Sequence, residues 1–332
     1  MSRSGFGPKT FDLARDADGK LIIHLVQGKE PEAAYTRSGF QQDQESDVST
    51  RNRIQAECRP AIEAAGISFE HETVLIFCNL TTWNEKSKTF IQHSPYCGFS
   101  TQTNGVRFAL DTVIQNLEDI PRNVPILNDD QYGDMSLGKF NTIFIGGIAH
   151  ELGHAFAFSH CGERWDEKPR GTSLMGIGND TYRDERRGEG KGSFLTMASA
   201  MFLAARPLFN GSDKGEGEPG QLQQCDLLLS TNLTRADLAR RRGALHLEGT
   251  VKGSSSLYGV VAYFDSVHDG CYRAPTATSV PDSQGRFAIE ISDLATCENG
   301  AMWVMFCHVN GAVTERQLGF SVNPDGDMDL GP

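Results

Sequence analysis

The eleven residues "HELGHAFAFSH" (His150–His160) hold three of the nine histidines in a chain of 332 residues. In an α-helix, which turns by about 100° per residue, His150 and His154 lie one turn apart on one face, so both imidazoles can reach a single ion. Glu151 lies at the edge of that face, within reach of a water molecule on the ion. The opposite face is apolar and predicts a helix that docks on a sheet. It comprises Phe144, Ile145, Ile148, Ala149, Leu152, Ala155 and Phe156.

These residue types suit a hydrolytic zinc site. In such sites zinc takes three protein ligands and keeps a fourth position for water, whose pKa it lowers to ~7. His150 and His154 would supply two ligands. Glu151 would be the general base that takes the proton of the water and delivers it to the leaving amine. A His-Glu-x-x-His sequence with a third histidine nearby is far more specific for a metal site than single histidines on a helix.

The third ligand is expected to be His160, provided that the helix ends after His154 and the chain turns back. Histidine is the commonest partner in such ligand sets. Cys161 could ligate as a thiolate, although a disulfide or a buried thiol is the expectation for it. The carboxylates that could replace His160 as third ligand are Glu163, Asp166 and Glu167.

The motif resembles that of the metzincin clan of zinc endopeptidases, His-Glu-x-x-His-x-x-Gly-x-x-His or Asp followed by a methionine in a tight turn. "SLMG" (Ser173–Gly176) supplies Met175, fifteen residues after His160, where the resemblance implies the methionine turn beneath the metal. The resemblance spans roughly residues 15–210, and it implies a zinc cofactor and a protein or peptide substrate. Tyr182, seven residues after Met175, is a candidate for stabilising the oxyanion, and an ordinary packing role competes with it.

One residue departs from the clan pattern, because Ala157 stands where the clan has glycine. That glycine takes a left-handed backbone conformation that ends the helix and turns the chain toward the third ligand. Alanine in this conformation costs roughly 1–2 kcal/mol. Either the chain tolerates that strain, or the helix ends differently and the third ligand changes.

The fold class predicted is α+β, with a zincin-like catalytic domain followed by an all-β sandwich. Residues 1–210 would form the metallopeptidase domain, which combines a mixed sheet with the active-site helix. Residues 211–243 read as a linker with a short helix, and the alternating apolar pattern of residues 244–332 predicts the sandwich.

Individual elements follow from local patterns. Residues 20–26 ("KLIIHLV") and 73–81 ("TVLIFCNLT") are predicted strands, the second one central in a sheet. Residues 45–66 are predicted to form a helix, and residues 114–139 a loop. A further helix is expected over residues 193–209, with Ser193 as its N-cap and Pro207 as its stop.

Composition limits the partners and the compartment. The formal net charge of −12 argues against nucleic acid and anionic membranes, because too few Lys and Arg side chains are present to neutralise phosphates. No apolar run is long enough to span a membrane, so membrane insertion is not expected. Eight cysteines without a CxxC pair favour disulfides in an oxidising compartment, with buried thiols as the alternative. We therefore expect a secreted protein whose signal peptide is missing from the given sequence, having been removed.

The function predicted is that of a secreted zinc endopeptidase with Glu151 as general base. One alternative is a zinc-dependent amidase that acts on a non-protein substrate. A second is a non-catalytic binding protein with a structural zinc, which requires a closed site with four protein ligands. An open metal site would exclude this second alternative.

Overall fold

The computed structural model describes residues 6–330 except 8, 12, 36–43, 69–71, 79, 93–96, 101–106, 112–115, 211–220, 232–242, 267–270, 295–299 and 323–327. The chain divides into two compact units. The first, here called the helix unit, contains Asp12–Ser159 and Gly178–Ser193. The second, here called the sandwich unit, contains Met1–Phe11, His160–Ile177 and Phe194–Pro332. The structure is thus a mixed α/β protein with several sheets, in agreement with the predicted presence of both element types.

The helix unit contains two small sheets. One has the order β1-β5-β4, in which β1 is parallel to β5 and β4 is antiparallel to it. The other has the order β2-β3-β6-β7. Residues 73–81 were predicted to form a central strand, whereas among the described residues β1 lies at an edge of its sheet. The strands are β1 (Thr73–Phe77), β2 (Thr81–Asn84), β3 (Thr89–Gln92), β4 (Cys97–Ser100), β5 (Arg107–Asp111), β6 (Ile126–Asp129) and β7 (Gly133–Ser136).

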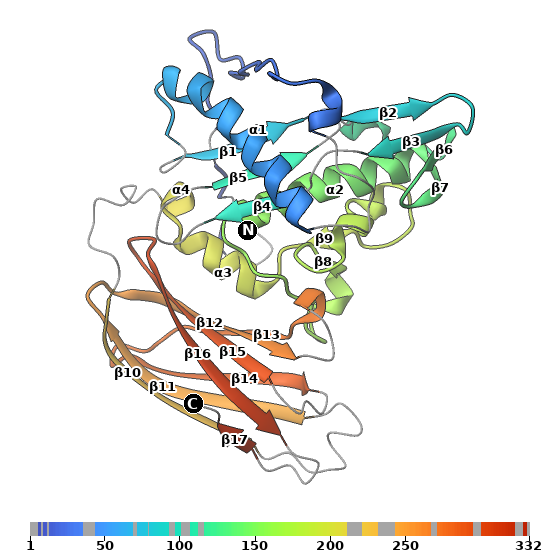
Figure 1. Ribbon diagram of the computed structural model, residues 1–332. Coiled ribbons are helices and arrows are strands. Elements are labelled where there is room, and N and C mark those ends of the chain that lie inside the picture. The colour runs from blue at the N-terminus through green and yellow to red at the C-terminus, as the bar shows by residue number, and fades with distance from the viewer. Residues whose placement is uncertain are drawn as a thin grey trace. The chain divides into compact units, whose positions relative to one another are not determined.

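Two helices complete the helix unit, and Figure 1 shows them beside its strands. In α1 (Gln44–Ala64), the buried Ile54 and Ile62 pack with apolar side chains of β1. The second helix, α2 (Leu137–Ala155), carries the histidine motif and contacts β4 and β5. Its first turns pack through aromatic and aliphatic side chains onto β3, β6 and β7, and this cluster comprises Phe140, Ile143, Phe144, Met135, Phe90 and Leu127.

In its described residues, the sandwich unit is built mainly of two larger antiparallel sheets and one longer helix. The sheets have the orders β10-β11-β14 and β13-β12-β15-β16-β17, and they share one apolar core. α3 (Met197–Ala205) is buried along its whole length except at Met197 and packs against β12, β13 and β15. The strands are β10 (Leu222–Thr231), β11 (Gly243–Gly253), β12 (Leu257–Ser266), β13 (Thr276–Ser279), β14 (Arg286–Leu294), β15 (Gly300–His308), β16 (Val313–Val322) and β17 (Met328–Leu330); the short elements are α4 (Pro207–Asn210), β8 (Thr172–Ser173) and β9 (Ser193–Phe194).

The early apolar segment differs from its prediction. Residues 20–26 form no strand. In the part of the chain that the structure describes, Leu21 forms one isolated β-bridge, with Arg15. Leu25 is 94% exposed, so the apolar side chains here are not held by a sheet. A strand needs a partner as well as a suitable sequence, and this pattern gave no information about the partner.

Three other segments also depart from prediction. Residues 114–139, predicted as loop, contain β6, β7 and the start of α2, for which Ser136 is the N-cap. α3 starts four residues later than predicted, because the Thr196 hydroxyl accepts the Ser199 amide at its N-terminus. β10 lies in the segment predicted as a linker. The short helix predicted after it falls on residues 232–242, outside the described residues, so the domain boundaries stay a prediction.

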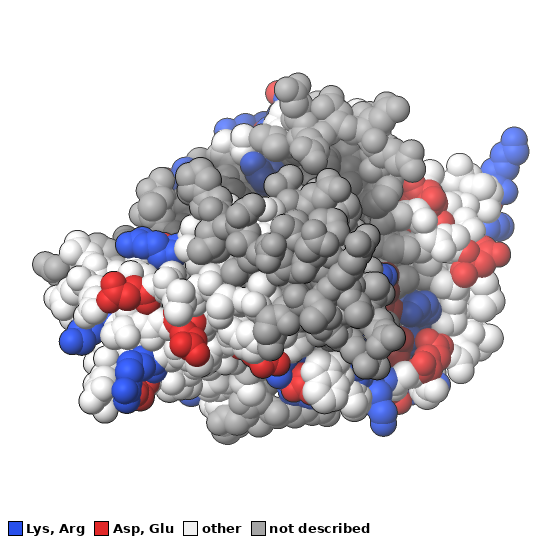
Figure 2. All heavy atoms as spheres, turned by 90° about the horizontal axis from the view of Figure 1, so that it is seen from below, with Lys and Arg blue, Asp and Glu red and all other residues white. Residues whose placement is uncertain are grey.

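Charges of both signs occur on one face of the protein. On the face shown in Figure 2, Lys and Arg side chains are interspersed with Asp and Glu side chains, which is typical of a solvated surface. Among the described residues, none of the helices combines the length and the apolar character that crossing a bilayer requires.

Four of the cysteines contradict the prediction that the cysteines form disulfides. Cys58, Cys161, Cys225 and Cys307 are free thiols, so the predicted disulfides are wrong for these four. Cys161 and Cys307 are fully buried, where a thiol acts as a small apolar side chain. Secretion stays a prediction.

We expect Cys161 and Cys307 to resist alkylation in the folded protein and to react after unfolding without reductant. Burial raises the pKa of the Cys161 thiol and raises that of Cys307 to about 12, so the reactive thiolate is scarce as well as inaccessible. Peptide mass spectrometry after iodoacetamide treatment of native and denatured protein measures this. A cysteine that stays unlabelled in both samples would contradict the thiol assignment.

Candidate active site

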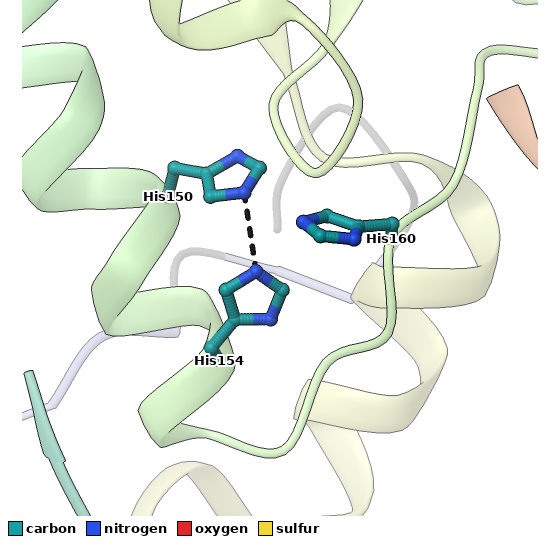
Figure 3. A group of neighbouring side chains, drawn as sticks. All are labelled: His150, His154 and His160. Carbon is teal, nitrogen blue, oxygen red and sulfur yellow. Dashed lines mark hydrogen bonds between the residues drawn. The ribbon is translucent and has the colours of Figure 1, made fainter. Parts of the chain in front are cut away.

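His150 and His154 extend from consecutive turns of α2, as the spacing predicts. Their Nε2 atoms lie 3.1 Å apart, and the rings meet edge to face with centroids 4.8 Å apart. Figure 3 shows both imidazoles on the same side of the helix. Two nitrogens bound tetrahedrally to one zinc at 2.0–2.1 Å would be about 3.3 Å apart. The pair is therefore spaced as two ligands of one ion would be.

The end of α2 fixes the orientation of His154. Its Nδ1 lies 2.8 Å from the Phe158 carbonyl oxygen, which can only accept, so Nδ1 carries the proton and donates. The Nε2 lone pair is then left for a metal. Burial lowers the pKa of His154, partly offset by this hydrogen bond, and a neutral imidazole is the form that binds metals.

The chain leaves α2 through the left-handed turn that the clan pattern places here. Ala157 has φ +66°, so the chain tolerates the strain. The Phe158 amide donates to the Gly153 carbonyl at 3.0 Å, and the Ala157 amide donates to the His154 carbonyl at 2.8 Å. These two hydrogen bonds form the Schellman motif, in which glycine usually occupies the left-handed position. Alanine at this position still turns the chain back toward the helix.

Replacing Ala157 by glycine is expected to raise the free energy of unfolding by about 0.5–1 kcal/mol. Relief of left-handed strain contributes about 1–2 kcal/mol, and the larger entropy of unfolded glycine offsets about 0.4–1 kcal/mol of it. Urea denaturation measures the difference. As a control, Ala155→Gly, which changes a buried helical residue two positions earlier, should lower stability by about 1 kcal/mol or more. A destabilised Ala157→Gly variant would contradict the strain argument.

His160 joins the pair. One ligand atom from each of His150, His154 and His160 lies within 4.8 Å of the others, and Figure 3 shows the His160 ring directed at the other two. Three histidines are thus arranged so that they could bind one metal ion. The alternative third ligands have other partners: Glu163 accepts the Ser173 amide at 3.0 Å, Asp166 accepts two hydrogen bonds from Arg164 at 2.9 and 2.8 Å, and Glu167 accepts the Met197 amide at 2.8 Å.

Glu151 is half-buried next to His150 and is held by a neighbouring strand. The backbone amide of Gly98, in β4, donates to its Oε2. Burial raises the pKa of Glu151 to about 7, against the lowering effect of the Gly98 hydrogen bond. A carboxyl group with such a pKa exists in both protonation states at neutral pH, which suits a group that must accept and then release a proton.

Gly98 belongs to the candidate site and was not predicted from the sequence. A Cβ at this position would overlap the carbonyl oxygen of Glu151 and lie 2.6 Å from the Cβ of His154. Only glycine allows the backbone of β4 to approach α2 so closely. A glycine inside a strand often marks such an approach, so "CGFS" carried a signal, although nothing in it named α2 as the neighbour.

Met175 lies in a tight turn, and its predicted place beneath a metal stays a prediction. It is fully buried in a turn that is closed by a 3.0 Å hydrogen bond from the Gly176 amide to the Ser173 carbonyl. Its own carbonyl accepts the Cys161 amide at 3.1 Å, which ties the turn to the residue after His160. The Cys161 thiol lies among hydroxyls rather than with the histidines, with Thr196 Oγ1 at 3.4 Å and Ser199 Oγ at 3.6 Å.

Tyr182 lies against α2, one turn before His150. A Cβ at Gly146 would lie 2.8 Å from that of Tyr182, so glycine makes room for the segment that contains it. Arg187, whose side chain is inaccessible, fixes this segment by donating to the Gly138 carbonyl at 3.1 Å and to the Thr142 hydroxyl. The proximity of Tyr182 to α2 is compatible with a site role, and its function stays a prediction.

The comparisons with known proteins concern the fold. No protein-family model matches the chain, and no curated protein matches it. Two crystal structures of wild-type OgpA from Akkermansia muciniphila are similar to this chain. One has a TM-score of 0.68 at 21% sequence identity and covers 97% of this chain and 83% of OgpA. The other has a TM-score of 0.69 at 22% sequence identity and covers 100% of this chain and 84% of OgpA. A third, of catalytically inactive OgpA in complex with an O-glycopeptide substrate, glycodrosocin, has a TM-score of 0.67 at 21% identity and covers 97% of this chain and 82% of OgpA. The chain therefore shares the fold of OgpA.

Proposed function

We propose that this protein is a zinc-dependent endopeptidase of the metzincin type, with Glu151 as its general base. The observation that supports the proposal most directly is the convergence of His150, His154 and His160 beside Glu151. Similarity to a fold that also occurs in an enzyme, OgpA, is consistent with it.

The donor set fits zinc. Three imidazoles are one of the ligand sets that catalytic zinc sites use, and they leave a fourth position open. When bound, zinc would polarise the scissile carbonyl and lower the pKa of water at the open position. The Phe158 carbonyl keeps His154 in the tautomer that presents Nε2.

The remaining steps belong to residues of the chain. Glu151 takes a proton from the attacking water and returns it to the leaving amine, and the Gly98 amide holds its carboxylate in place. Tyr182 is the candidate donor to the oxygen that becomes negatively charged. Met175 supports the turn hydrogen-bonded to Cys161, next to His160.

An edge strand beside Glu151 favours a peptide substrate. Within the described sheet, β4 pairs with β5 on one side and lies at the edge. An extended peptide can add to such an edge through backbone hydrogen bonds. Because Gly98 of β4 contacts Glu151, a peptide bound in this way would pass close to the general base.

O-glycosylated peptides are the substrate class to test first. The inactive form of OgpA was crystallised with an O-glycopeptide substrate, and this chain shares its fold over nearly its whole length. The proposed substrate is thus a peptide chain that carries a sugar on Ser or Thr.

The experiment compares two peptides of one sequence, with and without an O-linked sugar. Mass spectrometry would detect cleavage before chelation, after chelation with 1,10-phenanthroline, and after zinc is restored. We expect cleavage that chelation abolishes and zinc restores, with the glycosylated peptide preferred. Cleavage that persists without metal would contradict the zinc mechanism, and equal cleavage of the two peptides would contradict the glycopeptide preference alone.

The two alternatives predict other results. A non-protein amidase would leave both peptides intact while it binds zinc. A structural zinc needs a fourth protein ligand, and in the described part of the chain the histidine cluster has three members and does not include Cys161. We therefore favour the open, catalytic site.

A further inference from the structure

A short segment of the sandwich unit packs against the residues that follow α2. This segment, residues 271–275, leads into β13 and contains one turn of 3-10 helix, η7 (Cys271–Arg273). The Ala274 carbonyl accepts the Gly162 amide at 3.1 Å, and the Pro275 carbonyl accepts the Phe264 amide at 2.9 Å. The segment is thus bonded at one side to β12 and at the other to the chain two residues after His160.

Two glycines allow this contact to be a close backbone approach. A Cβ at Gly162 would lie 3.1 Å from the Cα of Arg273. A Cβ at Gly176, beside Met175, would lie 2.8 Å from the carbonyl oxygen of Tyr272. The sandwich segment therefore rests directly on the backbone that carries the third histidine and on that of the methionine turn.

Tyr272 brings this contact to the histidine itself. Its ring lies over the ring of His160, with centroids 4.0 Å apart and planes inclined by 33°. Tyr272 is 48% exposed, so half of the residue is not used in packing the sandwich core. Its ring belongs to the surroundings of the candidate metal site.

From this stacking we infer that Tyr272 positions the third metal ligand, which makes the β-sandwich a working part of the metal site rather than a spacer. The inference rests on the proposed function, because it assigns a role toward the same metal. His150 and His154 are oriented by a helix, whereas His160 lies on irregular chain beyond it. A flat ring at 4.0 Å limits rotation of the His160 imidazole and keeps it in the orientation that faces the other two.

The expected effect is on metal affinity. Side chains that orient metal ligands typically change affinity by about 10–100-fold when removed. Tyr272→Ala should therefore weaken zinc binding at least about tenfold. Tyr272→Phe should stay within about twofold of the unaltered protein, because it keeps the ring, and Tyr272→Leu, which keeps bulk without the flat ring, should weaken binding as alanine does.

Competition with a chromogenic zinc chelator measures affinity in the full-length protein, and thermal melting verifies that each variant is folded. Leu228→Ala is the matched control, because it truncates another exposed apolar side chain of the sandwich (62% exposed), far from η7 in sequence, and should leave zinc affinity unchanged. Should Tyr272→Ala unfold, the leucine and phenylalanine variants make the comparison.

The outcomes separate this inference from the proposed function. The positioning role would be overturned if folded Tyr272→Ala bound zinc with an affinity within twofold of the unaltered protein. If the alanine variant unfolds, the same result for Tyr272→Leu would overturn it. Loss of zinc in His154→Ala, measured alongside, would show that the zinc site itself is still supported. Absence of zinc binding in the unaltered protein would overturn the proposed function, and the inference with it.

Discussion

Replacing Glu151 by glutamine should reduce peptide hydrolysis by about 10³-fold or more while zinc binding is retained. General acid–base catalysis contributes about 10²–10⁴-fold, and Glu151 is proposed to act both as base and as acid. Glutamine has nearly the same shape, and its amide oxygen can still accept the Gly98 amide that now binds Oε2. The substitution therefore removes the proton acceptor with little change in geometry.

The measurement pairs the rate of glycopeptide cleavage with the zinc content of the purified variant. Glu63→Gln is a matched control, since it neutralises an exposed helical glutamate that pairs with Arg59, and it should cleave at the normal rate. A Glu151→Gln variant that cleaves as fast as the unaltered protein would remove Glu151 from the mechanism. Loss of zinc from the variant would instead mean that Glu151 contributes to the metal site itself.

The local part of the site could be predicted because the information was local. The spacing of His150, Glu151 and His154 within one helix fixes their relative directions, and the structure has them on two consecutive turns of α2. The conflict at Ala157 was also visible, because the backbone conformation it would need is known from the pattern. What the sequence left open was whether the chain accepts the strain, since that depends on packing against residues that the motif does not contain.

The remaining contacts depend on residues far apart in the chain. Gly98 lies 53 positions before Glu151, and Tyr272 lies more than a hundred positions after His160, so no periodicity or spacing connects either pair. The exposed residues 20–26 show the reverse error, since a sequence suited to a strand found no sheet. Local propensity identifies an element, and tertiary partners decide where and whether it forms.

The close approach of β4 to α2 leads to the second large expected effect. The Gly98 amide is the hydrogen-bond donor to Glu151, and its Cα lies where any side chain would meet the helix backbone. Adding a methyl group must push β4 and α2 apart, because the atoms it meets are the Glu151 carbonyl and the His154 Cβ rather than a flexible side-chain end. The displacement would act on the proposed general base, Glu151, and on a proposed metal ligand, His154, together.

Gly98→Ala should therefore lower the rate of cleavage by about 10²-fold or more, since a shift of about 1 Å in a catalytic group can cost that much. It should also lower the free energy of unfolding by about 1–3 kcal/mol through overpacking. Gly190→Ala is the matched control in the same unit, because a Cβ there would meet its nearest neighbour, the Asp184 Cβ, at an ordinary 3.8 Å. Cleavage rates and urea denaturation of the two variants give the comparison. Gly98→Ala could match Gly190→Ala in both the cleavage rate and the free energy of unfolding. In that case α2 would not restrain β4, and the Gly98 amide could not be what holds Glu151 in place.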